Sequence, residues 1–171
     1  MAVKRSLKIV KKAGRAGRGA AAPLTGGGRR VRPWTGAKGF KLLVSRDTST
    51  AARIEAIRGG VGARVVGEMV EYLDVPKTVI FGVLHTPEST AHRLIRDNRI
   101  LDSAATERVM RVADIMRMAE ETFGGRSAAT QWLKQINLAL GGRTPLSMLD
   151  TEPGAGEVRR ILASINHGGD Y

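Results

Sequence analysis

The chain has 171 residues, no cysteine and a formal net charge of +12. Its length suits one domain or two very small ones, and the lack of cysteine excludes a disulfide framework and a thiolate metal site. No apolar run approaches the ~20 residues that a membrane helix needs, and no signal-peptide apolar region follows the basic start. We therefore expect a cytoplasmic protein without membrane association, which the lack of cysteine fits.

The positive charge is concentrated in the N-terminal part. Residues 1 to about 46 hold thirteen Lys or Arg and no acid, whereas the rest of the chain holds fifteen Lys or Arg and sixteen Asp or Glu. The first segment is rich in Gly, Ala, Arg and Lys, and it has too few large apolar residues to offset the entropy of folding. We expect residues 1–47 to form a disordered basic arm.

Three interpretations of this basic arm stay open. It is an arm that attracts nucleic acid through counterion release, or it is a solvated tail, including one that begins at a start codon placed too early. An Arg-rich segment without acids also resembles an organelle transit peptide, which the bacterial character of the remaining sequence disfavours.

From Ser49 onward, the sequence predicts an all-α fold of six to eight short helices, because apolar residues recur at spacings of three and four. Nothing indicates a sheet. The apolar run 79–84 alone would fit a buried strand, but the preceding Pro76 favours a helix. The expected helices cover residues 50–59, 63–73, 76–84, 87–97, 103–123, 127–140, 145–149 and 155–166.

Local signals mark several of the expected helix ends. Thr86 is expected to cap the free amides of the helix that starts at Pro87. Gly124-Gly125 is expected to stop the long helix 103–123. Glu152-Pro153-Gly154 is expected to form a turn before the last helix. The residues expected on the solvent side of the long helix are Arg108, Arg111, Asp114 and Arg117.

Sequence motifs that mark enzymes are missing. There is no GxSxG, HExxH or GxxxxGK[ST] segment. His85, His92 and His167 lie far apart and lack metal-ligand spacing. Adjacent Glu120 and Glu121 face different sides of a helix, so they do not form an acid–base pair. We therefore expect no catalytic residue, no metal site, no cofactor and no enzymatic activity.

The segment from Leu73 to Asn98 has the plan of a helix-turn-helix. A short helix ends near Leu84, a tight turn follows, and a second helix starts with small polar residues. The N-terminal part of such a second helix meets base edges in DNA. The candidates for base contact are Ser89, Thr90 and His92, and the candidates for phosphate contact are Arg93, Arg96 and Arg99. An ordinary helical corner with surface arginines is the alternative.

The segment from Phe123 to Tyr171 carries an ordered series of motifs. They are Ala129-x-x-Trp132-Leu133, Asn137-x-Ala139-Leu140-Gly141-Gly142-x-Thr144-Pro145-Leu146, Leu149-x-Thr151-x-x-Gly154, Val158, Leu162 and Ile165-x-His167-Gly168. This series resembles the C-terminal toxin-binding domain of the Xre/MbcA/ParS antitoxin family. A weaker resemblance to the family's Xre-like helix-turn-helix unit extends back to about Ala63.

The resemblance implies two folded parts after the arm. An Xre-like helix-turn-helix bundle would cover residues 48–122, and a small helical toxin-binding domain would cover residues 123–171. The chain departs from the family in two places. Its basic arm is longer than the family needs, and His92 stands beside Arg93 where related proteins often show two basic residues.

The resemblance also implies a function. The chain would be the antitoxin of a type II toxin–antitoxin system and would neutralise, by direct contact, a RES-domain toxin that degrades NAD or uses it for ADP-ribosylation. It would also repress its own operon by binding operator DNA, as a homodimer and as a larger hetero-oligomer with the toxin. The alternative is a structural or regulatory nucleic-acid-binding protein that relies on its basic arm and has no toxin partner.

The end of the sequence is the expected toxin contact. The apolar stripe of the last helix stops after Ile165, and glycines follow. Asp170 would pair with an arginine that holds substrate phosphates, and Tyr171 would fill an aromatic or nicotinamide-like slot. A frayed terminus is the alternative. The predicted toxin-binding residues are Arg159, Leu162, Ile165, Asn166, His167, Gly168, Gly169, Asp170 and Tyr171.

Overall fold

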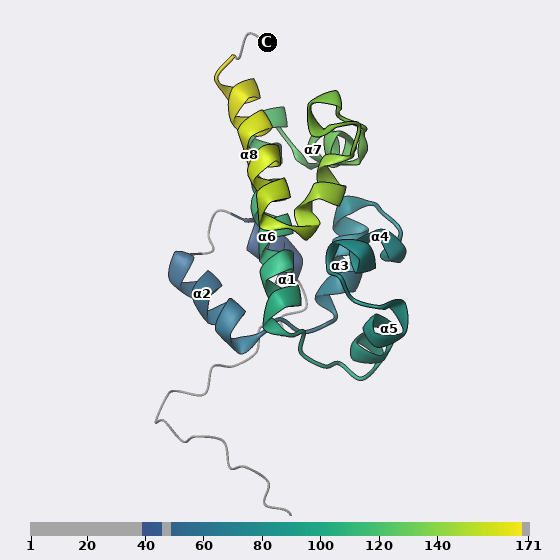
Figure 1. Ribbon diagram of the computed structural model, residues 1–171. Coiled ribbons are helices and arrows are strands. Elements are labelled where there is room, and N and C mark those ends of the chain that lie inside the picture. Colours follow the sequence, from purple (N-terminus) through teal and green to yellow (C-terminus); the bar gives the residue numbers. More distant parts are fainter. Residues whose placement is uncertain (1–38, 46–48, 169–171) are drawn as a thin grey trace, which may run out of the picture. The chain divides into compact units, whose positions relative to one another are not determined.

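Helices make up the regular structure that the computed structural model describes, over residues 39–45 and 49–168 (Figure 1). Within these ranges there is no strand, and the all-α prediction is confirmed. None of the described helices is long and apolar enough to cross a membrane. In chain order the elements are α1 (Gly39–Val44), α2 (Thr50–Gly59), α3 (Val65–Leu73), α4 (Lys77–Val83), α5 (Glu88–Arg96), α6 (Ser103–Phe123), α7 (Arg126–Lys134), the short 3-10 helices η1 (Leu138–Leu140) and η2 (Pro145–Asp150), and α8 (Glu152–Asn166).

The long helix α6 supports most of the others. Helices α1, α2, α7, α8 and η2 pack against it, so both predicted parts of the fold share one central helix. Asp102 fixes its start, because its carboxylate accepts a hydrogen bond from the amide of Ala105 at 2.7 Å. Gly124 ends it in the left-handed conformation with φ 77°, as the sequence predicted. Its fully buried residues include Val109, Val112, Ala113, Ile115, Met116 and Ala119.

Helix α1 corrects the prediction that residues 1–47 are disordered throughout. Phe40 and Leu43 are fully buried, and the amide of Phe40 donates to the Glu68 carboxylate at 2.7 Å. A six-residue helix is unstable alone, but packing against α3 and α6 stabilises this one. The rest of the predicted basic arm, residues 1–38 and 46–47, lies outside the described residues.

Three predicted helix boundaries are also wrong. Thr86 does not cap α5: Pro87 takes the N-cap position, and the Thr86 hydroxyl donates to the Leu84 carbonyl oxygen at 3.3 Å. Helix α7 ends at Lys134 rather than near Leu140, because the chain becomes extended at Gln135. Helix α8 begins at Glu152, so the predicted turn at 152–154 is its first turn, capped by Thr151.

Candidate functional site

The predicted helix-turn-helix is formed by α4, a tight turn and α5. Ile80 and Leu84 are buried and anchor α4, while Ala91 is the buried contact of α5. His85 turns the chain in the left-handed conformation, with φ 51°. The remaining surface of α5 is mostly exposed. The pair of helices therefore presents α5 outward, as a recognition helix requires.

The six predicted DNA-contact residues gather on or just beyond α5. Ser89, His92, Arg93, Arg96 and Arg99 are exposed, and Thr90 is half-buried. The ring of His92 packs edge-on against Phe81 at 5.3 Å between centroids, and its Nε2 lies 3.4 Å from the Glu88 carboxylate. His92 therefore already has a structural role on α5.

The three predicted phosphate-contact arginines all lie close enough to the Asp97 carboxylate for their charges to act on it. Arg96 donates to the Asp97 carboxylate at 2.8 Å, and this hydrogen bond, with the nearby charges of Arg93 and Arg99, lowers the pKa of the Asp97 carboxyl. Among the residues that the structure describes, the side chains of Arg93 and Arg99 form no hydrogen bond or ion pair. These two arginines are therefore the candidates best placed to bind an external anion.

The motif residues of the C-terminal segment are mostly architectural. Leu133 and Leu149 are fully buried, and Trp132 packs against Phe123 with 5.3 Å between ring centroids. The Thr144 and Thr151 hydroxyls accept hydrogen bonds from amides in the first turns of η2 and α8. The motifs thus build a platform on α6 rather than an exposed surface.

The predicted toxin-contact residues divide into three groups. Leu162 is fully buried and belongs to the core, so its assignment to the contact surface is wrong. Ile165, Asn166, His167 and Gly168 are exposed where α8 ends, and the exposed fraction of Ile165 is 44%. Gly169, Asp170 and Tyr171 lie outside the described residues.

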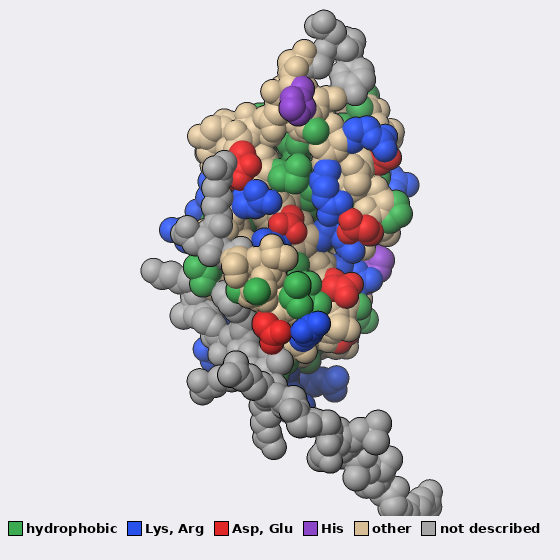
Figure 2. Space-filling model, turned by 90° about the vertical axis from the view of Figure 1, so that its left-hand side faces the viewer, with side chains coloured by type: hydrophobic (Ala, Val, Ile, Leu, Met, Phe, Trp, Pro, Cys, Tyr) green, Lys and Arg blue, Asp and Glu red, His purple; other side chains and the backbone are tan. Residues whose placement is uncertain are grey.

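Arg159, the remaining predicted contact, is held by an ion pair on α8. Its guanidinium lies 2.7 Å from the Glu152 carboxylate, and the hydrogen bond from Arg159 is the main reason why the pKa of that carboxyl is lowered. Arg160 pairs with Glu157 at 2.8 Å. Basic and acidic side chains are interspersed on the face shown in Figure 2, the left-hand side of Figure 1. Basic side chains on this face (Figure 2) therefore have acidic side chains among them.

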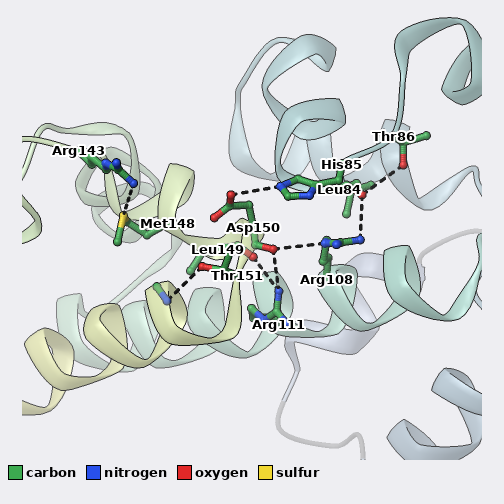
Figure 3. A network of polar contacts seen from close by, with 11 residues as sticks. Leu84, His85, Thr86, Arg108, Arg111, Arg143, Met148, Leu149, Asp150 and Thr151 are labelled. Atoms are coloured by element: carbon green, nitrogen blue, oxygen red, sulfur yellow. Dashed lines mark hydrogen bonds and ion pairs between the residues drawn. The ribbon is translucent and has the colours of Figure 1, made fainter.

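A polar network joins the helix-turn-helix to the C-terminal platform (Figure 3). Arg108 donates to the carbonyl oxygens of Leu84 and Asp150, both at 3.3 Å. His85 Nε2 lies 3.2 Å from the Asp150 carboxylate. The turn before α5 is thus linked to η2 directly, by the contact between His85 and Asp150, and also through Arg108 of α6.

Arg111 completes this network from the next turn of α6. It donates to the Leu149 and Asp150 carbonyl oxygens at 3.1 and 3.3 Å and pairs with the Glu152 carboxylate at 2.9 Å. Its side chain is only 13% exposed. The prediction that Arg111 lies on the solvent side is therefore wrong, because its side chain is held against η2, and Arg108 is half-buried.

Arg111→Ala is expected to lower the free energy of unfolding by about 1–3 kcal/mol, since it removes the side-chain donor to the Leu149 carbonyl oxygen and one of the two arginine donors to the Asp150 carbonyl oxygen and to the Glu152 carboxylate. Urea unfolding followed by circular dichroism measures this. Arg58→Ala is the matched control: Arg58 is 68% exposed and, among the described residues, pairs only with Glu55 on its own helix, so it should change stability by less than about 0.5 kcal/mol. Equal effects of the two changes would contradict a special role for Arg111.

No metal site accompanies these surfaces: among the described residues, no group of three or more His, Asp or Glu is placed to hold a metal ion. The architecture is that of a helix-turn-helix protein with a helical C-terminal platform.

Comparisons with known proteins match both parts. Residues 118–168 match the family model of the antitoxin Xre/MbcA/ParS C-terminal toxin-binding domain, and residues 52–114 match that of the antitoxin Xre-like helix-turn-helix domain. The predicted boundary near residue 122 lies in the last turn of α6.

Individual proteins with similar sequences agree with these family matches. The chain is 30% identical over 150 residues to the Prs ADP-ribosylating antitoxin of Sphingobium sp. strain YBL2, covering 82% of this chain and 94% of that protein. It is 30% identical over 129 residues to Antitoxin Xre of Yersinia enterocolitica, covering 74% and 84%. A 64-residue stretch is 41% identical to Antitoxin Xre of Photorhabdus laumondii, covering 37% and 43%.

The chain therefore belongs to the Xre/MbcA/ParS antitoxin family, as its motifs predicted. It is an antitoxin of a toxin–antitoxin system and carries a helix-turn-helix domain. This membership favours a protein with a toxin partner over the alternative of a nucleic-acid-binding protein that acts without one.

Proposed function

We propose that this antitoxin neutralises a RES-domain toxin that consumes NAD, and that it does so by direct binding with its C-terminal end at the toxin's NAD cleft. The observation that carries this proposal is the end of α8. The buried positions Val158 and Leu162 fix the helix to the platform, and the residues from Ile165 to Gly168 are then exposed. A helix end that is anchored on one side and exposed at its tip suits insertion into a cleft.

The chemistry of the last residues supports the same target. The sequence after α8 supplies an acid, Asp170, and an aromatic residue, Tyr171. A carboxylate pairs strongly with arginines of the kind that hold NAD phosphates. The relative from Sphingobium is named an ADP-ribosylating antitoxin, and ADP-ribosylation takes its ADP-ribose group from NAD. Both points favour a toxin that uses NAD.

Growth rescue tests this function in cells. Expression of the reading frame next to this antitoxin's gene is expected to arrest growth and lower cellular NAD, and co-expression of this chain should restore both. Persistent arrest, despite soluble antitoxin at equal or higher abundance, would contradict neutralisation by this chain.

The second proposed activity is repression of its own operon. Helix α5 is exposed, and the side chains of Arg93 and Arg99 form no hydrogen bond or ion pair within the described part of the chain, which favours binding to the phosphates of operator DNA. Palindromic half-sites would require a homodimer, and the toxin would join it in a larger complex. The basic residues before position 47 would add affinity that does not depend on sequence.

Replacing Arg93 and Arg99 together by Ala is expected to weaken operator binding and to make it less sensitive to salt. Each phosphate contact contributes about 0.9 to the slope of log affinity against log salt, so the slope should fall by about 2. Fluorescence anisotropy at several salt concentrations measures it. Arg160→Ala, which removes an exposed charge on α8, should leave the slope unchanged. An unchanged slope in the double variant would place the DNA contact elsewhere.

A further inference from the structure

Two apolar side chains are exposed to solvent after α7: Ile136, in the link between α7 and η1, and Leu138, the first residue of η1. Their exposed fractions are 71% and 88%, whereas no other large apolar side chain of the described part exceeds 47%. Single exposed apolar side chains are ordinary on a monomer, whereas grouped ones mark contact sites for other proteins. We call residues 135–143 the Asn137 loop.

The Asn137 loop is fixed by hydrogen bonds at its centre. The Asn137 amide donates to the Arg143 carbonyl oxygen at 3.0 Å, and the Asn137 carbonyl oxygen accepts from the amides of Leu140 and Gly142, both at 3.1 Å. The Asn137 side chain accepts from the amide of Ala139 at 2.9 Å. The residue between the two exposed side chains therefore organises the whole loop.

The far side of the loop is anchored too. Leu140 is only 6% exposed and enters the core, while Gly141 and Gly142 turn the chain back with φ of 65° and 77°. Because these constraints fix the backbone, Ile136 and Leu138 cannot turn inward without breaking the loop. Such a loop is already ordered, so a partner that binds it loses little conformational entropy.

The charged residues close to the Asn137 loop in the sequence are all basic. Between residues 122 and 149 the only charged residues are Arg126, Lys134 and Arg143. Lys134 pairs with Asp74 at 2.8 Å, whereas Arg143 contacts only the Met148 sulfur, at 3.9 Å, among the described side chains. A complementary partner would present an apolar recess with acidic residues at its rim.

We propose that Ile136 and Leu138 form a second contact site for the toxin, separate from the end of α8. The loop lies inside the segment that matches the toxin-binding domain, residues 118–168. In Figure 1 it also lies at the same upper end as the C-terminal end of α8. The inference rests on the proposed function and deepens it: the tail blocks the NAD cleft, and the loop supplies affinity.

Calorimetric titration of the full chain tests this site, with the purified product of the adjacent reading frame as the probe. Ile136→Ser and Leu138→Ser together are expected to raise the Kd by about a hundredfold, because each buried apolar side chain strengthens binding by roughly tenfold or more. The fold should be unchanged, since these side chains contribute little to the core. Ile54→Ser, 42% exposed on α2, is the matched control and should bind like the unaltered chain.

These measurements distinguish a failure of the loop proposal from a failure of the proposed function. If the unaltered chain does not bind the probe, the proposed function and the loop contact both fail. If it binds and the double variant binds equally well, only the loop proposal is overturned. If the double variant instead loses self-association in sedimentation, with toxin binding intact, the loop joins copies of this chain and the toxin proposal is again overturned.

Discussion

Removal of Gly168 to Tyr171 is expected to abolish inhibition of the toxin while leaving the antitoxin folded. The last buried position of α8 is Leu162 and Gly168 is exposed, so we expect the core to keep its packing. Charge-assisted hydrogen bonds are worth about 1.5–3 kcal/mol, so loss of those from Asp170 should raise the Kd for the toxin by roughly tenfold to hundredfold. The Asn137 loop would keep the truncated chain attached, but with the NAD cleft open.

Two measurements on the truncated chain check this. NAD consumption by the toxin should recover when truncated antitoxin replaces the full chain at saturating concentration, and thermal unfolding should be unchanged. Asp170→Asn in the full-length chain is the matched control for charge alone, with partial recovery expected. If the truncated chain still blocks NAD loss as well as the full chain at equal concentration, the tail does not occupy the cleft.

Gly154→Ala is expected to destabilise the fold by about 1–3 kcal/mol, the usual cost of overpacking. Gly154 is the glycine of the Leu149-x-Thr151-x-x-Gly154 motif. A methyl group there would overlap the Met148 carbonyl oxygen and lie 3.0 Å from the Thr151 hydroxyl that caps α8. Because the nearest obstacle is backbone, it cannot move aside as a flexible side chain would. The motif requires glycine for close packing of η2 against α8.

Gly156→Ala provides the matched control for this change. Gly156 lies two residues further along α8, and a methyl group there would meet nothing within 4 Å. Alanine favours a helix interior over glycine by roughly 0.5–1 kcal/mol, so this variant should be slightly more stable than the unaltered chain. Urea unfolding of the two variants measures the contrast. Equal stability of Gly154→Ala and Gly156→Ala would show that the close approach at Gly154 has no energetic consequence.

The helices that the sequence predicted well are those whose ends depend on local chemistry. Helix α2 has the predicted bounds, and α6 runs from the Asp102 cap to the Gly124 stop. Helix α1 was missed because its stability comes from burial of Phe40 and Leu43, which a basic, glycine-rich context hides. The Thr86 cap was wrong because Pro87, placed in the first turn by prediction, takes the cap position itself.

The candidate site was likewise predicted from the sequence only in part. Exposure of the α5 arginines followed from helical periodicity. The partial burial of Arg108 and Arg111 did not, since each donates to a carbonyl oxygen of η2, about 40 residues later in the chain. The Asn137 loop was hidden by the prediction of one helix over 127–140. The available signal was Asn137 followed by Gly141-Gly142, a combination typical of a turn rather than a helix interior.

We propose that this chain neutralises an NAD-consuming toxin by binding it directly. The most direct test is to follow NAD loss catalysed by the purified product of the adjacent reading frame while the full-length antitoxin is titrated in. We predict that NAD loss falls in proportion to added antitoxin and stops once toxin is saturated. NAD loss that continues at its initial rate in a large excess of folded antitoxin would contradict the claim.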